Sequence, residues 1–139
     1  MIHNEDYFNG KNGLKLYYQV WRPDENPKAI VQIVHGLIEH SGRYLNVVNK
    51  LVPKGYIIYG SDHRGHGKSE GIKAFVKNFD YFVDDQKTFF ELIKEKESDL
   101  PIFLLGHSMG ALVSIFFASK YQDQLKGLIL SGAGTRAGG

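Results

Sequence analysis

The chain has 139 residues, enough for one domain or for part of a larger one, and it contains no cysteine. Its 17 basic and 15 acidic side chains give a formal net charge of +2, and the two signs are interspersed. This balance argues against nucleic acid or a strongly acidic membrane as a partner. The lack of cysteine excludes a disulfide framework and a thiolate metal site.

The sequence contains no secretory or membrane-spanning signal that we can identify. Residues 1–6 are polar and acidic, whereas a secretory signal begins with basic residues and continues with an apolar stretch. The longest apolar run, 111–118, is interrupted by Ser114 and is far shorter than the ~18–20 residues that cross a bilayer. We therefore expect a cytoplasmic protein.

The first expected element is a β-hairpin. Residues 9–13 read Asn-Gly-Lys-Asn-Gly, which is a strong turn signal. Apolar and polar residues then alternate with period two from Leu14 to Trp21, as in a half-buried strand. We expect this strand to pair with residues 5–9 as an antiparallel edge of the sheet.

Buried strands and helices alternate over the rest of the chain. Short apolar runs predict strands with both faces buried at 29–34, 56–59, 101–105 and 125–130. Helical spacing of apolar residues predicts helices at 43–53, over about 19 residues from Phe79, and at 109–121. The glycines from Gly60 to Gly71 predict a loop. This order predicts an α/β fold with a mostly parallel sheet, whose active site lies at the carboxyl ends of the strands.

One of these strand ends carries a candidate nucleophile. Residues 106–110 read Gly-His-Ser-Met-Gly, a G-x-S-x-G motif between an expected strand and an expected helix. In such a turn Gly106 and Gly110 allow close packing, and Ser108 projects into the cleft at the positive end of the helix. The alternative is that Ser108 simply caps the helix between two incidental glycines.

A second strand end supplies a candidate oxyanion hole. Acyl transfer through a serine needs two backbone N–H donors for the tetrahedral intermediate. Met109, which follows the candidate nucleophile, provides one. We expect the other from Leu37, which follows His35 and Gly36 after the first buried strand. A plain turn at the strand end is the alternative.

The segment 62–69, Asp-His-Arg-Gly-His-Gly-Lys-Ser, admits three interpretations. It is not a phosphate-binding loop, because Asp62 stands where that motif needs its first glycine. A metal site made by Asp62, His63 and His66 lacks a spacing that would fix a further ligand. We favour a structural loop beside the cleft, held by hydrogen bonds of Asp62 and Arg64.

Residues 35–44, 62–71 and 106–110 together resemble, in sequence, order and spacing, three signature blocks of monoacylglycerol lipase and lysophospholipase-type α/β-hydrolases. The resemblance implies an α/β-hydrolase fold, with a serine hydrolase that cleaves monoacylglycerol or lysophospholipid esters through an acyl-enzyme. It implies no cofactor or metal, and peripheral lipid contact in the complete protein. The implied site comprises Ser108 as nucleophile, Leu37 and Met109 as oxyanion hole, Gly106 and Gly110 in the nucleophile elbow, and His35, Gly36, Glu39, His40, Arg43 and His107 as cleft-lining or supporting residues.

The resemblance leaves some related activities open. Peptidase-like or thioesterase-like chemistry is compatible with the same residues. A serine at position 108, in place of an acidic nucleophile, argues against epoxide hydrolase or dehalogenase chemistry.

The sequence lacks the rest of a catalytic triad. In α/β-hydrolases the acid and the histidine follow the nucleophile, but no histidine follows Ser108 and Asp123 is the only acid after it. The resemblance also implies a domain about twice as long, with a cap and further strands. We therefore expect residues 1–139 to be the N-terminal portion of one hydrolase domain, cut after about the sixth strand by truncation, a split gene or deliberate shortening.

Such a portion would be inactive alone and would leave the strand at 125–130 as an open apolar edge. We expect it to need a C-terminal complement or an oligomer for stability. The alternative function is a non-catalytic half-fold that binds an apolar acyl ligand or a protein partner through this exposed face.

Overall fold

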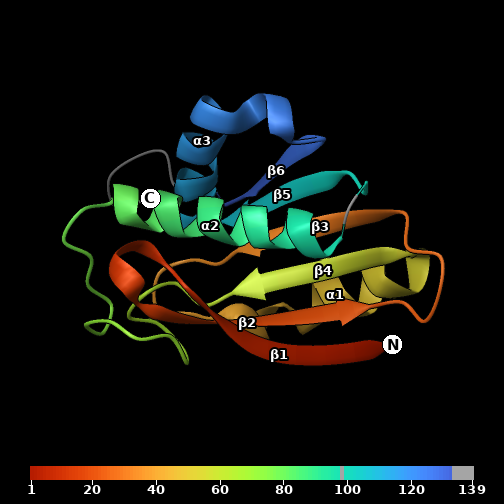
Figure 1. The fold of residues 1–139 in the computed structure, drawn as a ribbon, viewed down its shortest axis with the longest axis horizontal. Coiled ribbons are helices and arrows are strands. Elements are labelled where there is room, and N and C mark those ends of the chain that lie inside the picture. Colours follow the sequence, from red (N-terminus) through yellow and green to blue (C-terminus); the bar gives the residue numbers. More distant parts are fainter. Residues whose placement is uncertain (98, 133–139) are drawn as a thin grey trace.

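The computed structural model describes residues 1–97 and 99–132, which form a six-stranded sheet with helices on both faces (Figure 1). The strand order is β1-β2-β4-β3-β5-β6. The strands are β1 Ile2–Asn9, β2 Lys15–Arg22, β3 Ala29–Val34, β4 Tyr56–Ser61, β5 Ile102–His107 and β6 Gly127–Ser131.

The N-terminal hairpin is antiparallel, as predicted. β1 and β2 pair along their whole length, from Ile2 opposite Arg22 to Asn9 opposite Lys15. β2 then runs antiparallel to β4, whereas β4, β3, β5 and β6 are parallel to one another. The predicted mixed sheet, mostly parallel with an antiparallel edge, is therefore confirmed.

One glycine lies in a strand where a loop was expected. Gly60 belongs to β4 and is paired with Ile33 on one side and Gln19 on the other. A side chain there would have little room, because an added Cβ would lie 3.3 Å from Ser41 Cβ. The prediction for Gly60 was wrong because the cluster of glycines that follows it masked the end of the strand.

Helices cover the two faces of the sheet unequally. α2 (Asp80–Lys96) and α3 (Met109–Tyr121) pack on one face, and α1 (Leu45–Leu51) packs on the other (Figure 1). Short 3₁₀ turns occur at Lys11–Gly13, Ser41–Tyr44, Val52–Lys54 and Gln122–Gln124.

The single helix expected at 43–53 is instead divided into a 3₁₀ turn, α1 and a second 3₁₀ turn. Pro53 explains the second boundary, because its ring excludes the helical hydrogen bond and clashes with the preceding turn. Gly55, at φ 99°, then reverses the chain into β4.

The central strands have two buried faces, which explains their continuous apolar sequences. Towards α2 and α3, Ile30, Ile57 and Leu104 pack with Phe89 and Phe117. Towards α1, the opposite face of the same strands forms a second cluster with Val31, Ile33, Ile58, Val48 and Val52. The two layers fix the carboxyl ends of β3, β4 and β5 side by side.

β6 lies at the second edge of the sheet within the described residues. Its side chains Leu128, Ile129 and Leu130 are between 38% and 45% exposed, and Leu112 and Phe116 of α3 are each 42% exposed. This part of the structure therefore presents an apolar surface to solvent. Within residues 1–97 and 99–132, no helix has the length and apolarity needed to cross a bilayer.

Candidate active site

The chain turns sharply from β5 into α3 at Ser108. Ser108 has φ 57° and ψ −121°, a backbone conformation that strains any residue with a side chain. Its N–H donates to the Ser131 carbonyl oxygen over 2.9 Å, and its own carbonyl accepts from the Ala111 N–H over 3.0 Å. The strained turn is thus held from both β6 and α3.

Gly106 and Gly110 make this turn sterically feasible. A Cβ on Gly110 would lie 1.9 Å from the Val34 carbonyl oxygen, and a Cβ on Gly106 would lie 2.4 Å from both the Gly110 carbonyl oxygen and Ser114 Oγ. Both distances are far below contact distance. Glycine at both positions therefore allows α3 to begin directly against the ends of β3 and β5.

Ser108 occupies the N-cap position of α3, but its side chain makes no capping hydrogen bond. The residue is exposed. Its hydroxyl thus lies at the positive end of a 13-residue helix without serving that helix as a cap. This geometry argues against the interpretation of Ser108 as an ordinary capping residue.

The loop after β3 lies directly beside this turn. β3 and β5 are parallel neighbours, and their register places Val34 opposite Gly106. A Cβ on Gly36 would lie 3.2 Å from Ser108 Cβ and 3.2 Å from the His107 carbonyl oxygen. Leu37, which follows, is 51% exposed. The structure thus brings the two segments predicted to form the oxyanion hole into contact.

The remainder of this loop is fixed by local hydrogen bonds. The Tyr44 hydroxyl donates to the Glu39 carboxylate, and burial together with this bond raises the pKa of Tyr44. His40 Nδ1 accepts from the Gly42 N–H over 3.1 Å. Arg43 is exposed.

An open hollow of about 390 Å³ lies beside His107. It is lined by Glu39, Arg43, Tyr44, Asn46, Val47, Leu105, His107 and Ser131. His107 Nδ1 lies 3.2 Å from Ser131 Oγ. Across the part of the chain that the structure describes, no hydrogen bond joins the Ser108 hydroxyl to a histidine or a carboxylate.

His35 does not reach the cleft surface: its side chain is fully buried behind the loop. His35 Nδ1 lies 2.6 Å from the Gly36 carbonyl oxygen, and His35 Nε2 accepts from the His63 N–H over 2.9 Å. Burial lowers the pKa of His35 to about 3, and burial also holds the pKa of His63 well below its usual range. Both rings are therefore neutral at physiological pH.

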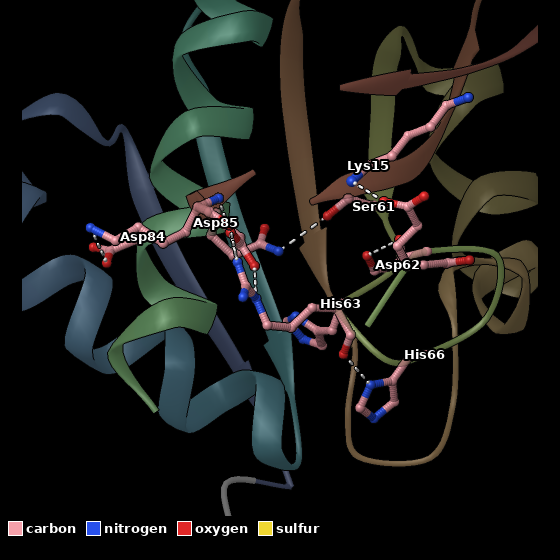
Figure 2. Close-up of polar contacts among 12 residues, drawn as sticks. Lys15, Ser61, Asp62, His63, His66, Asp84 and Asp85 are labelled. Atoms are coloured by element: carbon pink, nitrogen blue, oxygen red, sulfur yellow. Dashed lines mark hydrogen bonds and ion pairs between the residues drawn. The ribbon is translucent and has the colours of Figure 1, made fainter. Parts of the chain in front are cut away.

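The loop at 62–71 is held by its own polar side chains, as predicted (Figure 2). Asp62 Oδ1 accepts from the Ser41 N–H over 2.7 Å, and Asp62 Oδ2 accepts from the Lys68 N–H over 3.0 Å. Gly67, at φ 50°, gives the carboxylate room, since a Cβ there would lie 2.2 Å from Asp62 Oδ2. Asp62 thereby joins this loop to the loop that follows β3.

Arg64 anchors the same loop to α2. Its Nε and Nη2 donate to the two carboxylate oxygens of Asp85 over 2.7 and 2.9 Å, and Nη2 also donates to the Lys11 carbonyl over 2.9 Å. Asp85 Oδ1 accepts from the Lys11 N–H over 2.8 Å. Figure 2 shows Asp85 on α2, near the loop that carries His63.

Asp85 was not singled out from the sequence, although a signal was present. It lies among Phe82, Val83, Gln86 and Phe89, on the apolar stripe of α2, and it is buried. A carboxylate at a buried helical position requires a partner. Within residues 1–97 and 99–132, no group of three or more histidine, cysteine, aspartate or glutamate side chains is arranged to hold a metal ion.

The sheet is mostly parallel with helices on both faces, and a strained, exposed serine lies between a strand and a helix. Together these features define the α/β-hydrolase fold. The comparison with known sequences agrees. Residues 25–138 match the Hydrolase_4 family, described as serine aminopeptidase, S33. The chain belongs to this family of α/β-hydrolases.

Similar curated proteins carry lipase names. The chain is 34% identical over 134 residues to a monoacylglycerol lipase of Mycolicibacterium smegmatis, covering 96% of this chain and 48% of the relative. It is 38% identical over 119 residues to the monoglyceride lipase of Mus musculus, covering 86% of this chain and 39% of the relative. The resemblance to monoacylglycerol lipase and lysophospholipase-type hydrolases is thus confirmed. The chain spans less than half the length of these relatives.

Solved structures show the same fold. A thermostable carboxyl esterase from Bacillus coagulans, in complex with glycerol, has a TM-score of 0.85 and 34% identity, over 94% of this chain and 44% of that chain. A soluble variant of monoglyceride lipase from Saccharomyces cerevisiae, in complex with a substrate analogue, has a TM-score of 0.80 and 26% identity, over 95% of this chain and 44% of that chain. The α/β-hydrolase fold is therefore confirmed over the described residues.

Proposed function

We propose that this chain carries the nucleophile and the oxyanion hole of a serine hydrolase that cleaves acyl esters of the monoacylglycerol or lysophospholipid class. One observation carries the proposal: Ser108 is exposed in a strained turn at the N-terminus of α3, with the Gly36 loop packed against it. The names of the relatives support the substrate class.

The reaction follows from this arrangement. Ser108 Oγ attacks the ester carbonyl carbon, and the N–H groups of Leu37 and Met109 stabilise the negative charge that develops on the carbonyl oxygen. The alcohol leaves as the acyl-enzyme forms, and water then releases the fatty acid. A general base must take the proton of Ser108 in the first step and return it to the leaving alcohol.

We propose that the base and its carboxylate partner come from a C-terminal complement. The described residues offer Ser108 no such hydrogen-bond partner, and no histidine follows it in the sequence. Residues 1–139 are then the N-terminal portion of one hydrolase domain and are inactive alone. Leu37 and Ile38, both exposed in the loop that follows β3, are suited to contact an acyl chain or a lipid surface.

The second candidate is a non-catalytic half-fold that binds an apolar ligand or a protein partner. The exposed apolar side chains of β6 and α3 favour it, because a patch of this kind marks a surface that is normally covered. Under this hypothesis, ligand binding occurs without turnover even when a complement is present.

The test joins residues 1–132 to the C-terminal half of the Mycolicibacterium relative, divided at the equivalent position. The same relative, divided and rejoined, controls for the division itself. We expect hydrolysis of monoacylglycerol by the chimera, lost in Ser108→Ala and kept in Ser119→Ala, which changes an exposed serine of the same helix. Binding of monoacylglycerol without turnover, in a chimera that folds as well as the control, would favour the second candidate.

A further inference from the structure

His35 makes hydrogen bonds that fix its tautomer. A carbonyl oxygen only accepts, so the 2.6 Å contact with the Gly36 oxygen requires a proton on His35 Nδ1. The His63 N–H donates to His35 Nε2 over 2.9 Å, so Nε2 keeps its lone pair. The ring is therefore neutral, with Nδ1 as donor and Nε2 as acceptor, and its complete burial stabilises the same state.

His63 holds this arrangement from the neighbouring loop. Its own ring donates from Nε2 to the His35 carbonyl over 2.9 Å, so His63 donates two hydrogen bonds to His35, one from its backbone and one from its ring. The ring centroids lie 4.2 Å apart. His63 follows Asp62 (Figure 2), whose carboxylate ties the loops together. His35 is thus a rigid donor beneath the Gly36 peptide group.

The Gly36 carbonyl and the Leu37 N–H belong to the same peptide group. In a planar trans peptide the C=O and N–H bonds point in opposite directions. A hydrogen bond that turns the Gly36 oxygen inward to His35 therefore turns the Leu37 N–H outward, away from the buried ring. Gly36 itself packs against Ser108.

We propose that His35 is a positioning residue: its Nδ1–H orients the Gly36–Leu37 peptide group so that the Leu37 N–H faces the oxyanion formed at Ser108. The inference rests on the proposed hydrolase function. His35 does not touch the substrate, and it acts on the developing charge only through this peptide group. Loss of its hydrogen bond leaves the peptide group free to rotate, and transition-state stabilisation falls while substrate binding persists.

Two substitutions of His35 distinguish the role of Nδ1 from that of Nε2. The side-chain amide of asparagine reaches the position of Nδ1, so His35→Asn keeps a donor to the Gly36 oxygen. The longer glutamine places its amide at the position of Nε2, so His35→Gln keeps an acceptor for the His63 N–H and loses the Nδ1 donor. The pair distinguishes the bond to Gly36 from the bond to His63.

The experiment uses the active chimera described above and measures kcat, KM and the inhibition constant of a trifluoromethyl ketone, which forms a tetrahedral oxyanion on the serine. We expect His35→Gln to lower kcat by about 10- to 100-fold and to raise the inhibition constant of the ketone by a similar factor, while KM changes little. His35→Asn should stay within about threefold of the parent in all three quantities. A purely structural role would lower the melting temperature of both variants without this selective loss.

The outcomes are distinguishable. If the parent chimera folds and binds substrate but shows no turnover that depends on Ser108, the proposed function is wrong, and this inference is wrong with it. An active parent whose His35→Gln variant is folded and keeps its kcat and ketone affinity overturns this inference alone. If the variants do not fold, ¹⁵N NMR of the histidine rings in the parent decides. A proton on Nδ1 of His35 supports the proposal, and a proton on Nε2 alone contradicts it.

Discussion

At the scale of single residues, the strain at Ser108 is the feature most directly tied to chemistry. Its positive φ is kept by the hydrogen bond to Ser131 and by the close packing that Gly106 and Gly110 allow. A side chain in such a conformation costs about 1–3 kcal/mol, and the surrounding structure must offset it. Removal of the strain should therefore stabilise the protein, at the expense of the hydroxyl that we propose as the nucleophile.

The strain can be measured by comparing Ser108→Gly with Ser108→Ala in the chimera. Both variants lack the Ser108 hydroxyl, but only glycine adopts the turn without strain. We expect Ser108→Gly to be more stable than Ser108→Ala by about 1 kcal/mol in denaturant unfolding, after the entropy lost by glycine is counted. Equal stability, or a less stable glycine variant, would show that the turn is not strained.

Gly110→Ala tests the close approach of α3 to β3. The added methyl group would overlap the Val34 carbonyl oxygen, so the helix has to move. We expect a loss of about 1–3 kcal/mol in the free energy of unfolding, with loss of turnover. Lys120→Ala, at an exposed position of the same helix, should change stability by less than about 0.5 kcal/mol. A Gly110→Ala variant as stable as this control would contradict the packing described for the elbow.

The sequence could indicate the residues of the elbow but not the hydrogen bonds that hold the residues around it. The G-x-S-x-G spacing marks Ser108 because steric rules tie glycine to such a turn. The role that we propose for His35 could not be read from this spacing, since it depends on a hydrogen bond to Gly36 and another to His63, 28 residues away along the chain.

At the scale of elements, the Arg64–Asp85 pair connects the loop at 62–71, the first hairpin and α2. Both side chains are buried, and each also bonds to the backbone of Lys11. Removal of one partner leaves a buried charge without compensation. The loop beside the candidate active site thus depends on Asp85, a residue of α2 that lies outside that loop.

Asp85→Ala should therefore destabilise the protein strongly. We expect Asp85→Ala to lower the free energy of unfolding by about 3–5 kcal/mol. The double variant that also carries Arg64→Met should lose less. Glu91→Ala removes a surface ion pair with Lys87 and should cost less than about 1 kcal/mol. Urea unfolding of the two Asp85 variants and of Glu91→Ala measures these losses. A loss for Asp85→Ala no greater than that for Glu91→Ala would show that the pair does not hold the loop.

The elements themselves were largely predictable, because the strands are buried on both faces and therefore have continuous apolar sequences. α2 followed from its apolar stripe. The breaks around α1 were missed, although Pro53 indicates one of them, because the apolar spacing continues across it. Gly60 was misplaced because a glycine inside a buried strand cannot be recognised by hydrophobicity.

At the scale of the whole molecule, the buried neutral histidines couple stability to pH. The pKa of His35 is about 3 in the folded protein, whereas an unfolded histidine titrates near 6.5. Between these values the unfolded chain binds more protons than the folded one, so the free energy of unfolding decreases as pH falls through this window. The low pKa of His63 acts in the same direction.

The contribution of His35 is isolated by comparison with His35→Asn at pH 7 and pH 5. From pH 7 to pH 5, we expect the free energy of unfolding of the parent to fall by about 2 kcal/mol more than that of the variant. The same loss in parent and variant would mean that folding does not lower the pKa of His35. Urea unfolding of the chimera at both pH values provides the measurement.

The edge of the sheet also supports the proposal that a C-terminal complement completes the active site. β6 leaves an apolar edge within the described residues, and the chain spans less than half the length of its relatives. The absence of a histidine after Ser108 leads to the same expectation from the sequence.

The central claim is that Ser108 is a nucleophile that becomes reactive only with a C-terminal complement. The most direct test is intact mass spectrometry after incubation with a fluorophosphonate probe, with the modified residue located by peptide mapping. We predict a single adduct on Ser108 in the chimera, and none in Ser108→Ala or in residues 1–139 alone. An adduct on residues 1–139 alone would contradict the need for a complement. A folded chimera without an adduct on Ser108, under conditions that label the rejoined relative, would contradict the assignment of the nucleophile.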